Sequence, residues 1–134
     1  MKDFFKELFE VLGVDITPAN KTEVTISQVN NSLFLEGMMA CIIPLIFFFL
    51  FYFIINSSKF CQWYHWVLTL FISSIVSFGV VFAIFTSKSS NFQSADFPAK
   101  LSHGMAAFVI SFLVFIVVSF IGKWWSCNCR RTPF

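Results

Sequence analysis

Three long apolar segments constrain what this chain can fold into more than any other feature of its sequence. The first runs from Met38 to Ile55 without a charged residue, the second from Trp63 to Phe85, and the third from Gly104 to Gly122. Each approaches or exceeds the ~20 residues that a helix needs to cross ~30 Å of hydrocarbon. Each apolar side chain at a helix centre favours insertion by roughly 0.3–0.6 kcal/mol, which outweighs the few hydroxyl groups. We therefore predict an all-α integral membrane protein with three transmembrane helices.

The composition indicates that lipid is the solvent of this chain. The 134 residues are 57% hydrophobic and 12% charged, and 21 of them are phenylalanine. So much bulky apolar surface does not fit inside a soluble domain of this size. The formal net charge of +2 is too small and too scattered to predict nucleic-acid binding. We expect one membrane domain that is embedded in the lipid bilayer, which is thus its main binding partner.

An amphipathic helix is expected before the first span, and connectors separate the spans. In residues 2–13 the apolar side chains fall on one helical face, and Gly13 is a natural stop. The sequence TEVTIS at 22–27 alternates and is compatible with a short strand. Pro98 disfavours continuous helix through the last loop. The predicted boundaries are an amphipathic interfacial helix at 2–13, a polar connector at 14–32, membrane helices at 33–56, 63–86 and 103–123, a loop at 87–102 and a basic tail at 124–134.

The distribution of charge and of aromatic residues predicts an orientation. Three spans place the termini on opposite sides, and no acidic residue accompanies Lys59 or the basic tail on the C-terminal side. The other side has five lysines and six acidic residues, so raw counts of Lys and Arg do not separate the two sides. The density of positive charge does, because Lys123, Arg130 and Arg131 all lie within about ten residues of the third span. The positive-inside tendency therefore predicts a cytoplasmic C-terminus and an external N-terminus, in a plasma or inner membrane. The predicted interface anchors are Trp63, Trp66, Lys123, Trp124, Trp125, Arg130 and Arg131.

Small and hydroxyl-bearing side chains recur at helical spacing in the second and third spans. In lipid, such residues let two helix backbones approach closely. The same hydroxyl groups can line a water or ion path when several copies assemble. Both interpretations stay open. The candidate positions for pore lining or helix packing are Thr69, Ser73 and Ser77 in the second span and His103, Ala107 and Ser111 in the third, together with Glu36 in the first.

Glu36 is the most informative charge because apolar residues flank it at the mouth of the first predicted span. Intramembrane acids are costly and often functional. We expect Glu36 either to reach the interface or to be paired, with His103 and Lys100 as plausible partners on the same side. In an oligomer it would form a cation-attracting ring. Pro44 predicts a kink in the same span because it removes a backbone donor and frees the carbonyl of Ala40.

A zinc site is conceivable at the cytoplasmic face. Cys61 and His65 share a helical face, and Cys127 and Cys129 lie on the same predicted side of the membrane. These four side chains would make a Cys₃His set. The C-x-C spacing is not that of a usual zinc knuckle, however, and S-palmitoylation of juxtamembrane cysteines is an alternative. Reduced thiols are the default at a cytoplasmic surface, so we expect neither metal nor cofactor.

The sequence contains no grouping that predicts enzymatic chemistry, because it lacks a glycine-rich phosphate loop, a Ser/His/Asp set and paired carboxylates. Three spans alone do not enclose an aqueous path. We therefore expect a homo-oligomeric pore, channel or membrane-permeabilising protein. Its lining would be Glu36 and the hydroxyl stripe, by which we mean the hydroxyl groups of Thr69, Ser73 and Ser77 in the second span and Ser111 in the third. The layout is similar in topology to the three-span, N-out, basic-tailed phage holins. The alternatives are an accessory or scaffold subunit of a larger hetero-oligomeric membrane complex and a half-transporter that dimerises.

Overall fold

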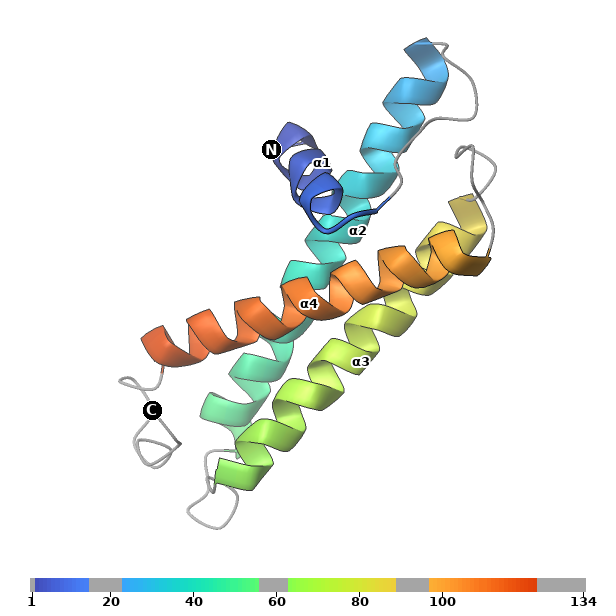
Figure 1. Ribbon diagram of the computed structural model, residues 1–134. Helices are drawn as coiled ribbons and strands as arrows, with labels where there is room; N and C mark the ends of the chain where they lie inside the picture. Colours follow the sequence, from blue (N-terminus) through green and yellow to red (C-terminus); the bar gives the residue numbers. More distant parts are fainter. Residues whose placement is uncertain (1, 15–22, 56–62, 89–96, 123–134) are drawn as a thin grey trace.

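The fold is a bundle of helices, seen in a computed structural model that describes residues 2–14, 23–55, 63–88 and 97–122 (Figure 1). The described part of the chain is helical throughout, apart from the turn at residues 12–14. In chain order the elements are α1 (Lys2–Val11), α2 (Glu23–Phe49), the π-helix η1 (Leu50–Ile55), α3 (Trp63–Lys88) and α4 (Phe97–Gly122).

Three of these helical segments are long and apolar enough to cross a membrane, which confirms the central prediction from the sequence. They are Thr25–Phe53 in α2 and η1, with 29 residues, and Trp63–Lys88 and Phe97–Gly122, with 26 residues each. At ~1.5 Å per residue their lengths are about 39–44 Å, more than the ~30 Å of a hydrocarbon core. The protein is thus an all-helical chain with three candidate membrane spans.

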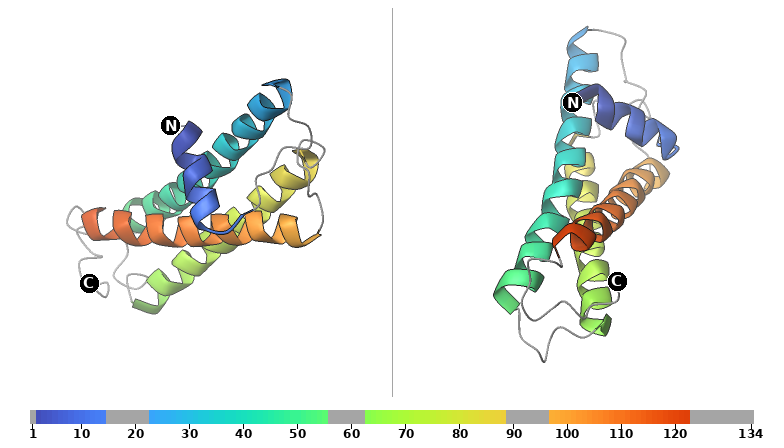
Figure 2. Two further views of the ribbon diagram at one scale, coloured as in Figure 1. Left: turned by 45° about the horizontal axis from the view of Figure 1, so that its top comes forward. Right: turned by 90° about the vertical axis from the view of Figure 1, so that its left-hand side faces the viewer.

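The three long helices enclose one apolar interior. α3 and α4 pack along one another, and α2 packs against both (Figures 1 and 2). One buried cluster, which includes Leu33, Phe85 and Ala107, lies toward the end of the bundle that carries α1. A second buried cluster, which includes Trp66 and Phe115, lies toward the other end. Side chains from all three helices therefore hold the bundle together along its length.

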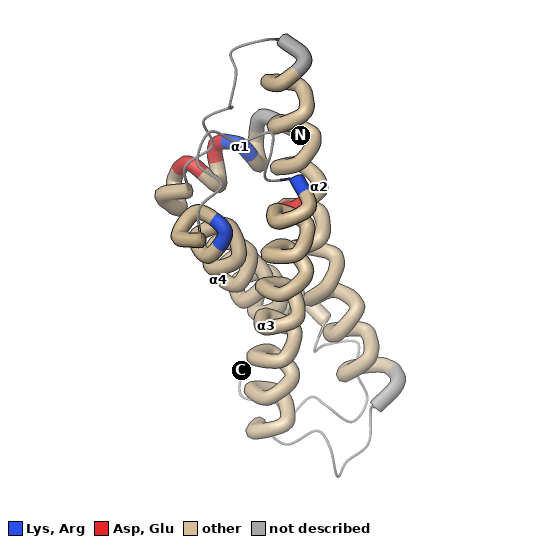
Figure 3. The backbone as a smooth tube through the Cα atoms, turned by 90° about the vertical axis from the view of Figure 1, so that its right-hand side faces the viewer, with Lys and Arg blue, Asp and Glu red and all other residues tan. Residues whose placement is uncertain are grey.

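The outer surface of the bundle is also apolar. The described ranges 37–55, 63–87 and 101–122 contain no Lys, Arg, Asp or Glu. Figure 3 accordingly shows the charged positions of the described helices gathered in the half of the molecule that contains α1. In water this surface would be a large exposed hydrophobic patch, whereas hydrocarbon solvates it at no cost. Its most exposed large side chains, each more than half exposed, include Ile46, Phe49, Leu68, Ile75, Leu113, Val117 and Ile121.

The first long helix begins earlier than the sequence predicted. We expected a polar connector through residue 32 and allowed a short strand at 22–27, but α2 already begins at Glu23. Val29 and Leu33 lie one turn apart and are both buried in the apolar cluster. Ser32 is accommodated because its hydroxyl donates to the carbonyl of Gln28 at 3.0 Å. Packing of this apolar stripe extends the helix into a segment that composition alone marks as polar.

The last helix likewise begins before its predicted start at residue 103, because α4 begins at Phe97. Pro98 is the second residue of α4. Proline is tolerated in the first helical turn, where its missing N–H would have no intrahelical acceptor, and its fixed φ suits a helix start. We read Pro98 as a barrier to helix, but it is placed where it favours helix initiation instead.

The helix irregularity nearest to Pro44 is a stretch of π-helix. Pro44 lies inside α2 and is buried, and η1 begins at Leu50, within the same candidate span. Such π-helical turns are rare inside α-helices and shift the side chains that follow them around the helix axis. The kink predicted at Pro44 itself stays a prediction.

Helix α1 is short and ends as the sequence indicates. Gly13 has a φ of 75°, a left-handed conformation that favours glycine. Its N–H donates to the carbonyl of Glu10 at 2.9 Å, and the N–H of Val14 donates to that of Phe9 at 3.1 Å. This pair of bonds is a Schellman motif, which closes the helix and turns the chain back toward the bundle.

Candidate functional site

The central polar feature of the bundle is a buried contact between Glu36 on α2 and His103 on α4. Nδ1 of the histidine lies 2.7 Å from Oε2 of the carboxyl group, and both side chains are 0% exposed. Both residues lie within candidate membrane spans. Of the two partners that the sequence suggested for Glu36, the structure brings His103 into contact, whereas Lys100 forms no ion pair with it among the described residues. Glu36 is therefore paired inside the bundle rather than exposed at its mouth.

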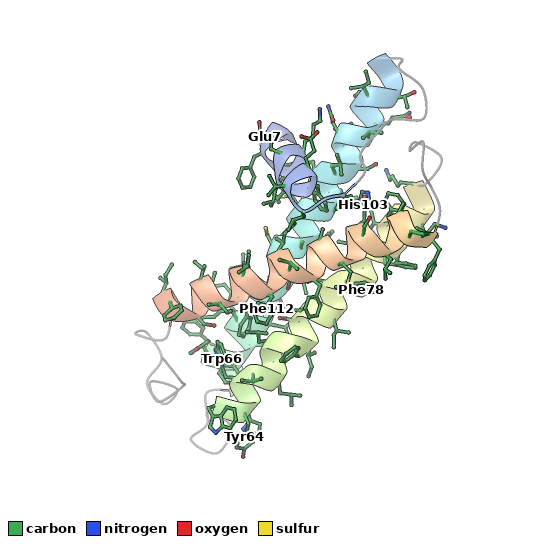
Figure 4. All side chains as sticks on the ribbon, viewed as in Figure 1. Glu7, Tyr64, Trp66, Phe78, His103 and Phe112 are labelled. Atoms are coloured by element: carbon green, nitrogen blue, oxygen red, sulfur yellow. The ribbon has the colours of Figure 1, made fainter. Side chains whose placement is uncertain are left out.

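Aromatic rings from two elements surround the imidazole of His103, which Figure 4 labels at the end of the bundle near α1. The ring of Phe85 on α3 has its centroid 4.0 Å from that of the imidazole. The ring of Phe9 on α1 is at 5.7 Å. Both phenylalanines are completely buried. In such low-dielectric surroundings a charged or hydrogen-bonding group is costly unless it is paired, which makes the contact with Glu36 important to the bundle.

One oxygen of the Glu36 carboxyl group has no hydrogen-bond partner among the described residues. Oε1 is buried, while Oε2 carries the contact with His103. A carboxyl oxygen in this position keeps its capacity to accept a hydrogen bond from water or to bind a cation. An unpartnered polar atom in a buried site often marks a reserve of strain or a functional role. In the described site, Oε1 is therefore the atom best suited to accept a further hydrogen bond or to bind a cation.

Helix α1 covers this site through two phenylalanines. Phe5 rests on Gly37, the residue next to Glu36, so closely that a Cβ atom at Gly37 would overlap the Phe5 ring. Phe9 contacts His103, as described above, so one face of α1 touches both helices that supply the pair. The sequence predicted an apolar face for residues 2–13 but gave no signal for what that face covers. Gly37 between Glu36 and Met38 was the available hint, since a close approach of another element favours glycine.

The predicted hydroxyl stripe lies mostly between α3 and α4. The hydroxyl groups of Ser77 and Ser111 are 3.0 Å apart and buried, so these two predicted positions contact one another across the helix pair. Ser73 is also buried and donates to the carbonyl of Leu70 at 2.9 Å. Thr69 is partly exposed and donates to the carbonyl of His65 at 2.8 Å. Within one chain these groups are used in helix packing or satisfied by their own helix.

Close approach of α3 and α4 also explains the small residues of the third span. Ala107 is completely buried, one turn from His103. A Cβ atom at Gly104 would lie 2.7 Å from Cε2 of Phe78 on α3, which is tighter than packed atoms tolerate. The small side chains thus leave room for aromatic rings of the neighbouring helix, as Figure 4 shows for Phe78.

Two of the predicted interface anchors behave differently from each other. Trp63 is 63% exposed, as a side chain in the interfacial layer would be. Trp66 is instead buried, and its indole N–H donates to the hydroxyl of Ser119 on α4 at 3.3 Å. Trp66 thus faces α4 within the bundle, a contact that the sequence did not predict, and its role as an interface anchor stays a prediction. Lys123, Trp124, Trp125, Arg130 and Arg131 lie outside the described residues.

Most of the conceivable zinc set also lies outside the described part of the chain. Of its four residues only His65 is described, whereas Cys61, Cys127 and Cys129 are not. Within residues 2–14, 23–55, 63–88 and 97–122, no group of three or more His, Cys, Asp or Glu side chains could hold a metal ion.

The fold and site together define a class: a helical protein with three candidate membrane spans around a buried carboxyl–imidazole pair. Comparison with protein-family models, with curated proteins and with solved structures finds no match for this chain.

Proposed function

We propose that this protein is a non-enzymatic subunit of a homo-oligomeric membrane assembly that acts as a pore or permeabilises its membrane. The observation that carries the proposal is the outward face of α3, where two small residues are exposed. Gly79 and Ala83 lie four residues apart, and a Cβ atom at Gly79 would meet nothing within 4 Å. In lipid, small residues at this spacing allow a second helix to approach closely.

The small-residue face continues with a large apolar neighbour. Ile75, one turn before Gly79, is 60% exposed. A second copy of α3 could therefore pack Ile75 beside its partner's glycine, with van der Waals contact as the driving force. The hydroxyl stripe of α3 is occupied by α4 within the same chain, as Ser77 and Ser111 show. The outward face of α3, with Gly79 and Ala83, is not used by α4 and is therefore available for self-association.

The polar lining of the proposed path would come from the interior of each chain. Glu36, His103, Ser77 and Ser111 are all buried between helices of a single chain. In this arrangement they are sealed from the surface, which corresponds to a closed state. Opening would require α3 and α4 to separate, so that their hydroxyl groups face water instead of one another.

The proposed orientation has the basic tail in the cytoplasm and α1 outside. α1 would lie at the outer surface of a plasma or inner membrane, since Lys6, Glu7 and Glu10 are exposed on it. Phe5 and Phe9 face the bundle. A short helix with one polar and one apolar face is suited to the interfacial layer.

Reconstitution tests the proposal through one outward-facing substitution. Purified wild-type protein should run as one oligomeric species in mild detergent and should release a trapped ion or small dye from liposomes. Gly79→Leu should abolish both, because it adds bulk to the proposed contact at a position where a Cβ atom meets nothing within 4 Å inside the chain. Val117→Phe is the matched control: it adds bulk at a position of α4 that is 56% exposed and should leave both properties unchanged.

Two outcomes would count against the proposal. A monomeric wild-type protein that leaves liposomes sealed, yet co-purifies from native membranes with other membrane proteins, would favour the accessory role. If the protein oligomerises and conducts but Glu36→Gln and Ser77→Ala both leave conductance unchanged, the assembly is retained and the proposed lining is wrong.

A further inference from the structure

The burial of the Glu36–His103 pair depends on an element that is not one of the three long helices. α1 packs mainly against α2, beside the residue that follows Glu36. Its Phe9 ring lies over the imidazole of His103 at a centroid distance of 5.7 Å. Without α1, the Glu36–His103 pair would be exposed on the side where Phe5 and Phe9 now lie.

Helix α1 depends on this docking for its own stability. It has 10 residues, fewer than the about 12–15 at which isolated helices become marginally stable in water. Phe5 and Phe9 face the bundle, while Phe4 and Val11 are 60% and 83% exposed. Through these exposed apolar side chains α1 could also bind the lipid interface of a bilayer. α1 thus has two apolar surroundings available, the bundle and the lipid interface.

The site that α1 covers would gain from contact with water. Oε1 of Glu36 is buried and has no hydrogen-bond partner among the described residues. A buried acceptor without a partner loses the hydration that it would have in water. Hydration of this oxygen would offset part of the lost contacts of Phe5 and Phe9. Of the ionisable side chains on α1, those that the structure describes, Lys6, Glu7 and Glu10, are exposed and lie away from the docked face.

From these contacts we propose that α1 is a movable cap that opens and closes the Glu36–His103 pair to water, and with it to protons and cations. In the closed state Phe5 sits on Gly37 and Phe9 on His103. In the open state α1 moves to the lipid interface and water reaches Oε1. The inference concerns water access within one chain and does not depend on the oligomeric pore proposed above.

Site-resolved carbodiimide labelling tests the cap directly. Detergent-solubilised full-length protein is treated with a water-soluble carbodiimide and glycine methyl ester at fixed pH, and the labelled fraction of each carboxyl group is measured by mass spectrometry. Glu7 and Glu10, which are exposed on α1, serve as internal references in every sample. Glu36→Gln confirms the assignment of the Glu36 signal. In the wild type, Glu36 should label far more slowly than Glu10.

Substitutions at Gly37, Phe5 and Phe9 should each open the cap. In Gly37→Ala the new Cβ overlaps the Phe5 ring, so this ring must move off Gly37 and its docking on α2 is weakened. An overpacked contact of this kind should raise the labelling rate of Glu36 by about tenfold. Phe5→Ala removes the ring that rests on Gly37 and should raise the rate as well, and adding Gly37→Ala to it should raise the rate no further, because the overlap is gone. Phe9→Ala, which removes the ring over His103, should also raise it.

Gly122→Ala is the matched control because its Cβ overlaps Phe48 at the opposite end of the bundle, far from α1 along α4. It should leave the labelling of Glu36 unchanged. The cap is refuted if Glu36 labels as fast as Glu10 in the wild type, or if Gly37→Ala and Phe9→Ala both leave its rate unchanged. It is also refuted if Gly122→Ala raises the rate as much as Gly37→Ala does, because access would then follow general loosening of the bundle. None of these readouts involves conductance or oligomerisation, so the cap and the pore can fail separately.

Discussion

Nδ1 of His103 and Oε2 of Glu36 lie 2.7 Å apart although the two residues are 67 positions apart in the sequence. The contact ties α2 to α4, the first and last of the long helices. Both side chains are completely buried, so water does not compete with the interaction. Removing one partner would leave the other unpaired in an apolar environment, which destabilises the fold more than replacing both partners does.

Substitution of one member of the pair should therefore cost more than substitution of both. We expect Glu36→Leu alone to lower the free energy of unfolding by about 3 kcal/mol, since it leaves the imidazole buried without its carboxyl partner. Glu36→Leu combined with His103→Leu should cost less than the sum of the two single changes. Unfolding in mixed detergent–SDS micelles gives these free energies. Additive effects would show that the two residues do not interact in the membrane.

The hydrogen bond between Ser77 and Ser111 should contribute little by itself. Interhelical hydrogen bonds in membrane proteins are worth about 0.6 kcal/mol on average, so a double-mutant cycle of Ser77→Ala and Ser111→Ala should give a coupling of that size. Ser77→Leu should be much more damaging, at about 1–3 kcal/mol, because it forces α3 and α4 apart. If Ser77→Leu were tolerated as well as Ser77→Ala, the close packing of the two helices would be contradicted.

Two glycines should respond in opposite ways to the same substitution. Gly104→Ala places a Cβ atom 2.7 Å from Cε2 of Phe78 and should destabilise the protein by about 1–2 kcal/mol. Gly79→Ala meets nothing within 4 Å inside the chain and should be neutral or stabilising by up to about 1 kcal/mol, because alanine favours helix. Thermal unfolding of the two variants under identical detergent conditions makes the comparison. Equal destabilisation would mean that α3 and α4 are not packed as described.

The two tryptophans at the start of α3 should also differ. Trp66→Phe loses the hydrogen bond to Ser119 and part of a buried ring, and we expect a cost of about 1 kcal/mol. Trp63→Phe changes a side chain that is 63% exposed and should cost less than about 0.5 kcal/mol. The same denaturation assay serves for both. A larger effect at Trp63 than at Trp66 would contradict the burial of Trp66 against α4.

The proposed orientation makes a prediction for the native cysteines. In this orientation Cys61, Cys127 and Cys129 would lie on the cytoplasmic side, whereas Cys41 lies within a candidate span. A membrane-impermeant thiol reagent should therefore leave the wild-type protein unlabelled in intact cells and label it after permeabilisation. Ser87→Cys, at the opposite end of α3, should be labelled in intact cells and serves as the positive control. Labelling of the wild type from outside would reverse the orientation.

The class of fold follows from the sequence because insertion into lipid is decided locally. Each long segment carries enough apolar side chains to favour hydrocarbon on its own, so no knowledge of its neighbours is needed to predict three spans. The end of α1 at Gly13 was equally readable, since the left-handed turn needs glycine at that position. The starts of the helices were harder to predict. Packing extends α2 back to Glu23, and the first-turn Pro98 allows α4 to begin at Phe97, so both helices begin before their apolar runs.

The site required the tertiary structure. The sequence offered Glu36 two partners on the same side of the membrane, and the choice of His103 over Lys100 follows from the way α4 crosses α2. The sequence likewise marked Trp66 as an interface anchor but did not reveal its contact with Ser119, which depends on the rotation of α3 about its axis. In a helix that is apolar all round, periodicity does not reveal which face is buried. The sequence therefore determined that this protein has three candidate membrane spans, and only the packing of its helices decided that its one intramembrane acid is paired, buried and covered by α1.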